Sequence, residues 1–481
     1  MNYKSNRKVQ LVFLTFCTLN ERNDKSMDNN MKNIDTDSYE TDSLSPIPAN
    51  KRIMGGTSYL LAWLGGCVSI GNFSLGSNLV EGGLNLIQSI VAIALGSTLV
   101  AVCLVLNDKL CYKTGIPYVV QLRSSFGFKG TFIPSLCRAI PGVIWYGFQS
   151  WVGASALNEV SKILFDYNNI VLFFILFHLI QIGLSALGFK GIKAIENIGG
   201  IIIIIAALTY MLITILKLHG NVVTEQLMNT KGSWGLPFFG AVTSFIGVNC
   251  AVLINVGDYV REVKTGMGPG KRGVIYCLAL IPATVFMGVI GLLVTKVTGI
   301  ANPVVGFAQI VPNKLVVILT LVFIIFAQIT TNLLNNALPP IYALMDIVKL
   351  NFKKSAIIVG LAAFATFPWE LIKESSAAGL NIFILAYSAF LGPIFSILVV
   401  DYYILRKQKI NLNDYYNPDG PFKGINFPAI VAIIVGVIFS LMFVEVSWLA
   451  SIIPTAVTYY FFSKYKEKKS IKQINTEKLT Q

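Results

Sequence analysis

Hydrophobic residues occur along this chain in stretches of roughly 20, separated by short polar connections. A helix needs about that length to cross some 30 Å of hydrocarbon. The pattern predicts an all-α integral membrane protein with about twelve transmembrane helices. They centre on residues 61–78, 86–106, 133–157, 170–187, 198–215, 238–256, 274–294, 315–338, 355–367, 380–405, 428–444 and 448–462.

Composition and charge agree with membrane burial. Of the 481 residues, 54% are hydrophobic and only 13% are charged, too few to cover a soluble protein of this size. The net charge of +14 could indicate a nucleic-acid partner, but its distribution argues against one, because every second connection is basic. These residues are Lys109, Lys113, Arg123 and Lys129; Lys190 and Lys193; Arg261, Lys264, Lys271 and Arg272; Lys349, Lys353 and Lys354; Arg406, Lys407 and Lys409.

Basic connections face the cytoplasm, so twelve spans place both termini there, in a plasma or inner membrane. Residues 1–50 are polar and aperiodic and are expected to form a disordered cytoplasmic tail. We expect a first repeat of five helices over 51–220, a second over 232–405, two further helices over 406–465 and a basic cytoplasmic tail over 466–481.

Two spans, the first and the sixth, carry glycine and asparagine at mid-membrane depth. The first has Gly65, Gly66, Gly71 and Asn72, and the sixth has Gly247 and Asn249. Glycine frees backbone groups that hydrocarbon cannot satisfy, so breaks in matching spans indicate an inverted-repeat transporter with broken helices 1 and 6. Close helix packing at glycine explains these residues equally well.

Neutral polar side chains gather in two other spans. Trp145 and Gln149 lie one turn apart in the third, where an indole and an amide can stack on a flat ring and bind its edge. An interfacial tryptophan and an inter-helix glutamine would look the same. The eighth span holds six amide or hydroxyl side chains in ten residues, with Gln328, Asn332 and Asn336 on one stripe. That density favours a cavity and an uncharged planar cargo.

The sequence gives little support for a metal site, a catalytic triad or a cofactor. The seven cysteines form no C-x-x-C pair, and the two histidines, His178 and His219, exclude most metal sites and His-dependent triads, so we expect neither an enzyme nor a cofactor. His178 lies within the fourth span, which leaves proton coupling open beside the reading of a core histidine. Neutral oxygens otherwise suit a hard monovalent cation as the coupling ion.

The chain resembles the nucleobase–cation symporters, which include cytosine, purine, uracil and allantoin permeases and the sodium–hydantoin transporter. The likeness covers about residues 51–465. Its most specific segments are Arg123-Ser-Ser-Phe-Gly-x-x-Gly130, Trp145-Tyr-Gly-Phe-Gln149-Ser-Trp151, Asp258-Tyr-Val-Arg261, Thr330-Thr-Asn332 with Asn336, and Leu391-Gly-Pro393 leading to Asp401.

The resemblance implies a five-plus-five inverted repeat followed by two extra helices. It also implies that Trp145 stacks on the substrate ring, that Gln149 and Asn336 bind its edge, and that Asn332 supports them. The implied sodium ligands are the carbonyls of Gly65, Val68 and Ala327 and the hydroxyls of Thr330 and Thr331.

This chain departs from that pattern at two substrate-facing positions. Asn249 stands where the hydantoin and cytosine transporters have an aromatic residue, and Ser69 where the hydantoin transporter has a glutamine. The leading hypothesis is sodium-coupled uptake of a nucleobase or related heterocycle. The alternatives are proton-coupled transport of allantoin, hydantoin or a thiamine-precursor pyrimidine, and, from other classes, a channel or an intramembrane enzyme.

Overall fold

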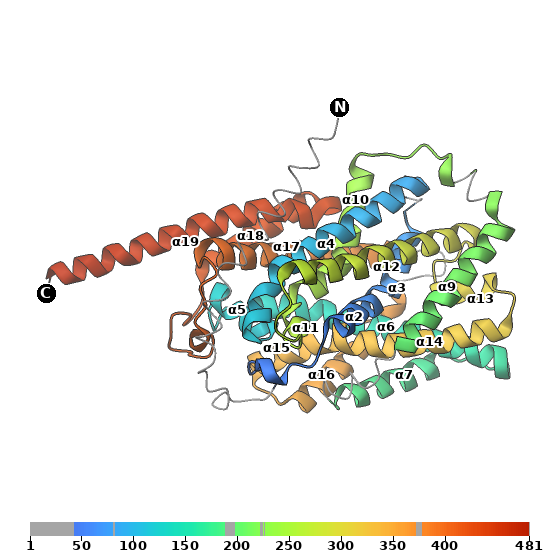
Figure 1. The fold of residues 1–481 in the computed structure, drawn as a ribbon, viewed down its shortest axis with the longest axis horizontal. Coiled ribbons are helices and arrows are strands. Elements are labelled where there is room, and N and C mark those ends of the chain that lie inside the picture. The colour runs from blue at the N-terminus through green and yellow to red at the C-terminus, as the bar shows by residue number, and fades with distance from the viewer. Residues whose placement is uncertain are drawn as a thin grey trace.

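A computed structural model describes residues 43–79, 82–187, 198–221, 225, 227–371 and 378–480. These residues form helices joined by short connections, and the one β-type pairing among them is an isolated parallel bridge between Met54 and Val263. The long helices run side by side in one bundle, and the last helix projects from one end of it (Figure 1). The all-helical fold class is therefore confirmed.

Helices occupy all the predicted spans of the first half. The first span is a bent pair, and its two helices meet at 40°. The elements are η2 (Ala49–Lys51), α2 (Gly56–Cys67), α3 (Ile70–Ser77), α4 (Leu86–Thr114), α5 (Tyr118–Phe126), α6 (Phe132–Phe165), α7 (Ile170–Ser185) and α9 (Ile198–Leu218). The short helix α5 lies in a basic connection, and the hydrophobic pattern did not predict it.

The second half repeats this arrangement and adds two helices. Its elements are α10 (Leu236–Ile254), α11 (Gly257–Val260), α12 (Pro269–Thr298), α13 (Pro303–Ile310), α14 (Lys314–Asn332), the π-helical segment η4 (Leu333–Ala337), α15 (Leu338–Val348), α16 (Phe352–Phe364), η5 (Pro368–Glu370), α17 (Ala378–Val399), η6 (Val400–Leu405), η7 (Leu412–Tyr415), α18 (Phe427–Met442), η8 (Val444–Val446) and α19 (Ser447–Thr480). The eighth predicted span thus continues, through a π turn, into a longer helix.

Five helices of the described chain are by themselves long and apolar enough to cross a membrane, and the bent pair α2–α3 makes a sixth. Three shorter apolar helices lie at residues 170–185, 208–218 and 427–442. A helix stands at each predicted span, while the count of twelve crossings stays a prediction.

The sixth span corrects one expectation. Helix α10 runs unbroken past Gly247 and Asn249, and the chain is interrupted only after Ile254, where α11 follows. The predicted break at Gly247 and Asn249 is wrong because that glycine serves close packing: a Cβ there would lie 2.6 Å from Ile384 Cγ2 and 2.7 Å from Ser388 Oγ of α17.

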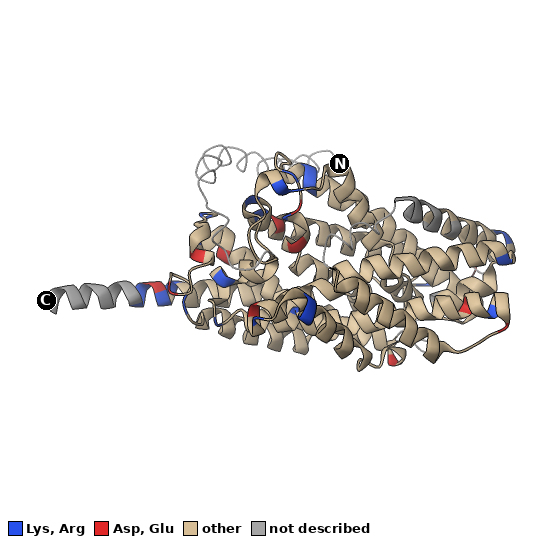
Figure 2. Ribbon diagram, turned by 90° about the horizontal axis from the view of Figure 1, so that it is seen from below, with Lys and Arg blue, Asp and Glu red and all other residues tan. Residues whose placement is uncertain are grey.

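The bundle has one end rich in basic residues, which we call the basic end. Lys and Arg gather toward the end from which α19 projects, with few at the opposite end (Figure 2). Most of the predicted N-terminal tail, residues 1–42, lies outside the described residues. Its last part packs on the basic end, where Arg261 donates to the Ser43 carbonyl (2.9 Å) and Tyr416 to the Leu44 carbonyl (2.8 Å). The C-terminal segment continues α19 as a helix.

Helix α12 holds the first span in place. It packs against α2, α3 and α4. The contact with α3 is close enough that a Cβ at Gly291 would lie 1.9 Å from the Phe73 carbonyl oxygen, so only glycine fits there. The half of the broken span that follows the break is therefore fixed to the second half of the chain.

Candidate functional site

The break in the first span lies at Val68 and Ser69, between α2 and α3. Ser69 begins α3, and its hydroxyl accepts a hydrogen bond from the Asn72 backbone N–H (3.4 Å). The Asn72 side chain reaches back over the break and donates to the Cys67 carbonyl (2.8 Å). The predicted break is confirmed, and Asn72 satisfies one of the backbone groups that it frees.

Trp145 of α6 lies between the first and the sixth spans. A Cβ at Gly71 of α3 would be 2.9 Å from Trp145 Cη2, so this glycine admits the indole. The indole N–H donates to the Tyr387 hydroxyl (3.3 Å), which in turn donates to the carbonyl of Gly247 in α10 (2.9 Å). Trp145 is buried and thus linked to both of the glycine-containing spans.

The amides of the eighth span connect it to the first half of the chain. The Asn332 side chain donates to Gln181 Oε1 of α7 (2.6 Å) and to the Tyr146 carbonyl of α6 (3.0 Å). Asn336 donates to Asn332 Oδ1 (2.8 Å), as the predicted stripe requires. Asn332 and Asn336 therefore belong to one buried network that holds α6, α7 and η4 together.

Several amide side chains on α3, α6, α7 and α14 keep a buried polar atom without a hydrogen-bond partner among the described residues. A buried polar atom left unpaired costs about 1–3 kcal/mol, so each of these atoms is available to a water molecule or a ligand. Gln149 is the most informative, because its unpaired oxygen lies one turn from Trp145 on α6. The atoms are Asn72 Oδ1, Gln149 Oε1, Gln181 Nε2 and Gln328 Oε1.

The residues expected to hold sodium come from two helices in contact, α2 and α14. Helix α3 starts its own hydrogen-bonding pattern at Ser69, whose carbonyl accepts from Phe73 (3.3 Å), so the carbonyls of Gly65 and Val68 stand at the interruption. The Thr330 hydroxyl donates to the carbonyls of Phe326 and Ala327 at 3.3 Å each. Thr331 is half-buried. The expected ion ligands are all neutral oxygens, the type that suits a monovalent cation.

Asn249 of α10 directly follows Val248, which faces Gly71 beside Trp145. It lines a pocket between α2, α10, α11 and η4, which we call the basic-end pocket; its walls include Tyr59, Trp63, Asn249, Tyr259 and Asn335. Met54 also lines it and pairs with Val263 in a basic connection, so the pocket lies toward the basic end. Trp145, Gln149, Ser69, Asn332 and Asn336 do not line this pocket.

Sequence reasoning did not select Trp63, Tyr259 or Asn335 as site residues. A signal existed for each: Trp63 and Tyr259 lie in segments already noted, and Asn335 is one of the six polar residues of the eighth span. Asn335 was passed over because it lies off the i, i+4 stripe. The π turn over Leu333–Ala337 gives Asn335 and Asn336 different partners, Tyr259 and Asn332.

The segment after the sixth span joins α11 to α5. Asp258 accepts hydrogen bonds from the Tyr118 N–H (2.9 Å) and from the Asn255 side chain (3.1 Å). Burial raises the pKa of the Asp258 carboxyl, and these bonds together with Arg261 act in the opposite direction. Arg138 of α6 reaches the same place, donating to the Ala251 carbonyl (2.7 Å), Asn255 Oδ1 (2.9 Å) and the Asn335 carbonyl (2.6 Å).

Known proteins similar to this chain are transporters. It is 27% identical to the hydantoin permease of Microbacterium maritypicum over 85% of this chain and 86% of that protein. It is 26% identical to the allantoin permease of Bacillus subtilis over 85% and 88% of the two chains. Among solved structures, Mhp1, a nucleobase–cation-symport-1 family transporter in a closed conformation with bromovinylhydantoin bound, superposes with a TM-score of 0.80 at 25% identity, covering 89% of this chain and 96% of that one.

The family comparison covers most of the sequence. The family described as "Permease for cytosine/purines, uracil, thiamine, allantoin" matches residues 46–464. This range contains both repeats, the broken first span and every residue of the candidate site, and it makes the protein a membrane transporter rather than an enzyme. The chain belongs to this family of permeases.

Proposed function

We propose that the protein takes up a small planar heterocycle of the nucleobase, hydantoin or allantoin type, together with a sodium ion. The observation that carries this proposal is the buried, unpaired amide oxygen of Gln149, one turn from the Trp145 indole. A flat ring that carries an N–H group would stack on the indole and donate to that oxygen.

Each remaining member of the proposed substrate site has a definite task. Asn336 hydrogen-bonds the ring edge, and Asn332, tied to Gln181 and the Tyr146 carbonyl, holds Asn336 in position. Ser69 stands at the break between α2 and α3. Asn249 meets the cargo from the basic-end pocket. The named relatives, permeases for hydantoin, allantoin and, in Arabidopsis thaliana, purines and uracil, support a cargo of this chemical class.

The proposed ion lies where the first and eighth spans meet. Its ligands are the carbonyls of Gly65, Val68 and Ala327 and the hydroxyls of Thr330 and Thr331. Support comes from the break at Val68, from the contact between α2 and α14, and from the absence of charge in this oxygen set. An ion that binds one conformation better than another shifts the protein toward it, which couples the ion to alternating access.

We propose that the protein lies in the plasma or inner membrane with the basic end and both termini in the cytoplasm. The excess of Lys and Arg at that end supports this orientation.

Proton coupling is less well supported than sodium coupling, because the surroundings of His178 fit a structural role. The side chain is buried in an aromatic cage, with Tyr146 stacked at 5.2 Å and Phe364 at 4.0 Å between ring centroids. Its Nε2 is hydrogen-bonded to the Gly360 carbonyl at 2.8 Å, which fits a neutral core histidine that joins α7 to α16.

Uptake by the purified protein in liposomes tests this function. We expect labelled uracil, hydantoin, allantoin or hypoxanthine to accumulate when sodium is higher outside, and to stop accumulating when sodium is replaced by potassium. A set of heterocycles that all fail to enter would refute the cargo class. Uptake that is driven by a proton gradient and does not depend on sodium would refute sodium as the coupling ion. It would favour proton coupling, for which His178 is the candidate residue.

A further inference from the structure

Helix α17, the tenth predicted span, contributes a buried tyrosine to the surroundings of Trp145. The hydroxyl of Tyr387 accepts a hydrogen bond from the Trp145 indole N–H (3.3 Å) and donates one to the Gly247 carbonyl of α10 (2.9 Å). One phenol therefore joins α17 both to the proposed stacking residue on α6 and to the sixth span. The sequence pattern did not select Tyr387 as a site residue.

Close packing at Gly247 brings Tyr387 within reach of the indole. A Cβ at Gly247 would lie 2.6 Å from Ile384 Cγ2 and 2.7 Å from Ser388 Oγ, so α17 approaches α10 as closely as a glycine allows. Ile384, Tyr387 and Ser388 are three and four residues apart on α17 and share one helix face. The contact that requires a glycine therefore also directs the tyrosine toward α10 and α6.

The indole of Trp145 is fixed at two opposite edges. Its six-membered ring faces α3, where a Cβ at Gly71 would lie 2.9 Å from Cη2 and 3.3 Å from Cζ3. Its N–H, on the five-membered ring, points to the Tyr387 hydroxyl. The rings of Phe148 and Phe383 meet the indole at 77° and 57°, with centroids 5.4 and 6.0 Å away. Neighbouring side chains therefore set the plane of the indole.

The orientation of this plane matters because stacking requires two nearly parallel rings. The second side-chain torsion of a tryptophan is broad, so packing alone leaves the indole some freedom to turn. A hydrogen bond to the indole N–H selects one orientation, since a buried N–H without a partner is unfavourable. The Tyr387 hydroxyl is itself held in place, because its proton is donated to the Gly247 carbonyl.

We propose that Tyr387 is a positioning residue of the substrate site, which holds the Trp145 indole in the orientation that stacks on the heterocycle. This inference rests on the proposed function. Tyr387 acts through the indole and does not itself contact the cargo. Its hydroxyl therefore contributes to the affinity for the cargo and not to the rate at which the loaded protein turns over.

Tyr387→Phe tests this role, because it removes the hydroxyl and keeps the ring that packs on Phe383, 4.9 Å away between centroids. Uptake of labelled uracil and hydantoin would be measured in proteoliposomes containing the full chain. The half-saturation concentration should rise about fivefold, the size of one ordinary hydrogen bond, while the maximal rate changes less than twofold. An unchanged half-saturation concentration, or a fall in the maximal rate alone, would overturn the assignment.

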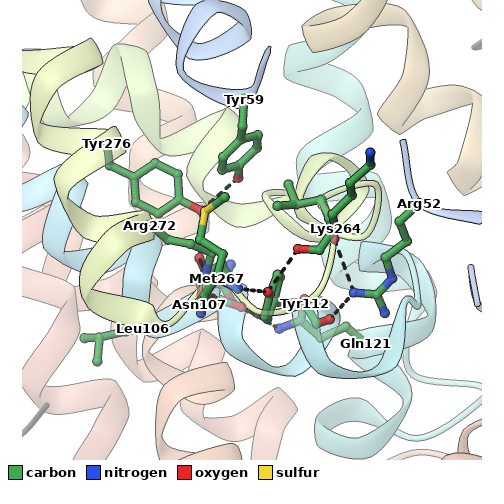
Figure 3. Close-up of polar contacts among 12 residues, drawn as sticks. Arg52, Tyr59, Leu106, Asn107, Tyr112, Gln121, Lys264, Met267, Arg272 and Tyr276 are labelled. Atoms are coloured by element: carbon green, nitrogen blue, oxygen red, sulfur yellow. Dashed lines mark hydrogen bonds and ion pairs between the residues drawn. The ribbon is translucent and has the colours of Figure 1, made fainter. Parts of the chain in front are cut away.

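Tyr112 provides a matched control, because its hydroxyl forms the same kind of bridge at the basic end. It accepts from the Met267 backbone N–H (2.7 Å) and donates to the Lys264 carbonyl (3.1 Å), as Figure 3 shows. Tyr112→Phe should change the half-saturation concentration less than twofold. Equal rises in the two variants would show a general effect of losing a bridging hydroxyl, and Tyr387 would then have no positioning role.

Combination with Trp145→Phe separates positioning of the indole from support of α10. Trp145→Phe keeps an aromatic face but has no N–H to donate to Tyr387. If Tyr387 acts through the indole, adding Tyr387→Phe to this variant should raise the half-saturation concentration less than twofold further. A further fivefold rise would show that the hydroxyl acts through Gly247 alone, which contradicts the proposal.

Cargo binding to the purified variants in detergent keeps the test decisive where reconstitution fails. The cargo concentration that gives half of the maximal rise in unfolding temperature should follow the same order among the variants. Wild-type protein that neither takes up nor binds these heterocycles would refute the proposed function and this assignment with it. Wild-type uptake together with unchanged affinity in Tyr387→Phe would refute the assignment alone.

Discussion

The first and sixth spans occupy equivalent places in the two repeats and carry the same signal, glycine and asparagine, but the first is broken close to these residues and the sixth only after Ile254. In the first, the chain bends by 40° at Val68 and Ser69, and Asn72 reaches across to the Cys67 carbonyl. In the sixth, α10 continues, and Asn249 bonds to Phe245 one turn earlier in the same helix. The asparagine of the first span therefore bridges a break, whereas the asparagine of the sixth lies within a continuous helix.

The surroundings of individual glycines in the two spans also differ. A Cβ at Gly247 would collide with Ile384 and Ser388 of α17, whereas a Cβ at Gly66 would make only an ordinary contact, 3.5 Å from Asn335 Nδ2. Gly71 of the first span is packed as closely as Gly247, since a Cβ there would lie 2.9 Å from Trp145 Cη2, so the space beside Gly66 is local. The proposed ion ligands of the first span lie at its break, where the helix is interrupted at Val68 and Ser69.

The largest effect is expected at Trp145, which is linked to both spans. Trp145→Ala should abolish concentrative uptake, because stacking of a ring on an aromatic side chain contributes about 1–3 kcal/mol, or about 5- to 150-fold in affinity. Uptake by the variant in proteoliposomes, corrected for protein amount, measures this. Trp151→Ala is the matched control, since Trp151 lies on the same helix but packs on Phe174 and Trp369. Equal losses in both variants would remove Trp145 from the site.

Alanine substitutions at Gly247 and Gly66 compare a glycine required for close packing with a glycine that has space beside it. Gly247→Ala should lower stability by about 1–3 kcal/mol, because the added methyl group overpacks the contact with α17. Gly66→Ala should be neutral or stabilising by up to about 1 kcal/mol, because alanine is the better helix former and space is available. Thermal unfolding of both variants in detergent checks the contrast. A Gly247→Ala protein as stable as the parent would contradict the packing explanation.

The comparison of the first and sixth spans shows which features of the fold could be predicted from the sequence. Hydrophobic length alone located a helix at every expected span, because about 20 apolar residues have few other uses. It could not show that Gly247 serves close packing within a continuous helix, since that depends on Ile384 and Ser388, well over 100 residues away in the chain.

The candidate site was predictable to a similar extent. The i, i+4 spacing of Asn332 and Asn336 correctly placed them in one hydrogen-bonded stripe. Asn335 was missed because the π turn changes the helical register within the eighth span. The pattern of residue types does not predict such a turn. The pocket lined by Asn249 joins four elements from three parts of the chain, so no local pattern could have revealed it.

Thr331 of α14 tests the claim that the ion binds where the eighth span meets the broken first span. Thr331→Ala should raise the sodium concentration for half-maximal uptake about tenfold, a loss of about 1.4 kcal/mol, while uptake at saturating sodium persists. Sodium titration of heterocycle uptake measures this. Thr320→Ala on the same helix is the control, because its buried hydroxyl donates to the Val316 carbonyl and lies outside the proposed ligand set. A sodium dependence identical in the three proteins would exclude Thr331 as a ligand.

The smallest expected effect is a difference in stability between alanine variants of Asn72 and Asn249. Asn72→Ala removes the one side-chain donor that reaches the Cys67 carbonyl across the break, and the carbonyl then stays unsatisfied in a buried place. Asn249→Ala removes a bond to the Phe245 carbonyl, which in a continuous helix already accepts the backbone N–H of residue 249. In cargo-free protein we therefore expect Asn72→Ala to cost about 1 kcal/mol more than Asn249→Ala, measured by thermal unfolding. If both variants lost the same stability, Asn72 would not hold the bend, and the break would have to depend on the packing of α3 against α12 alone.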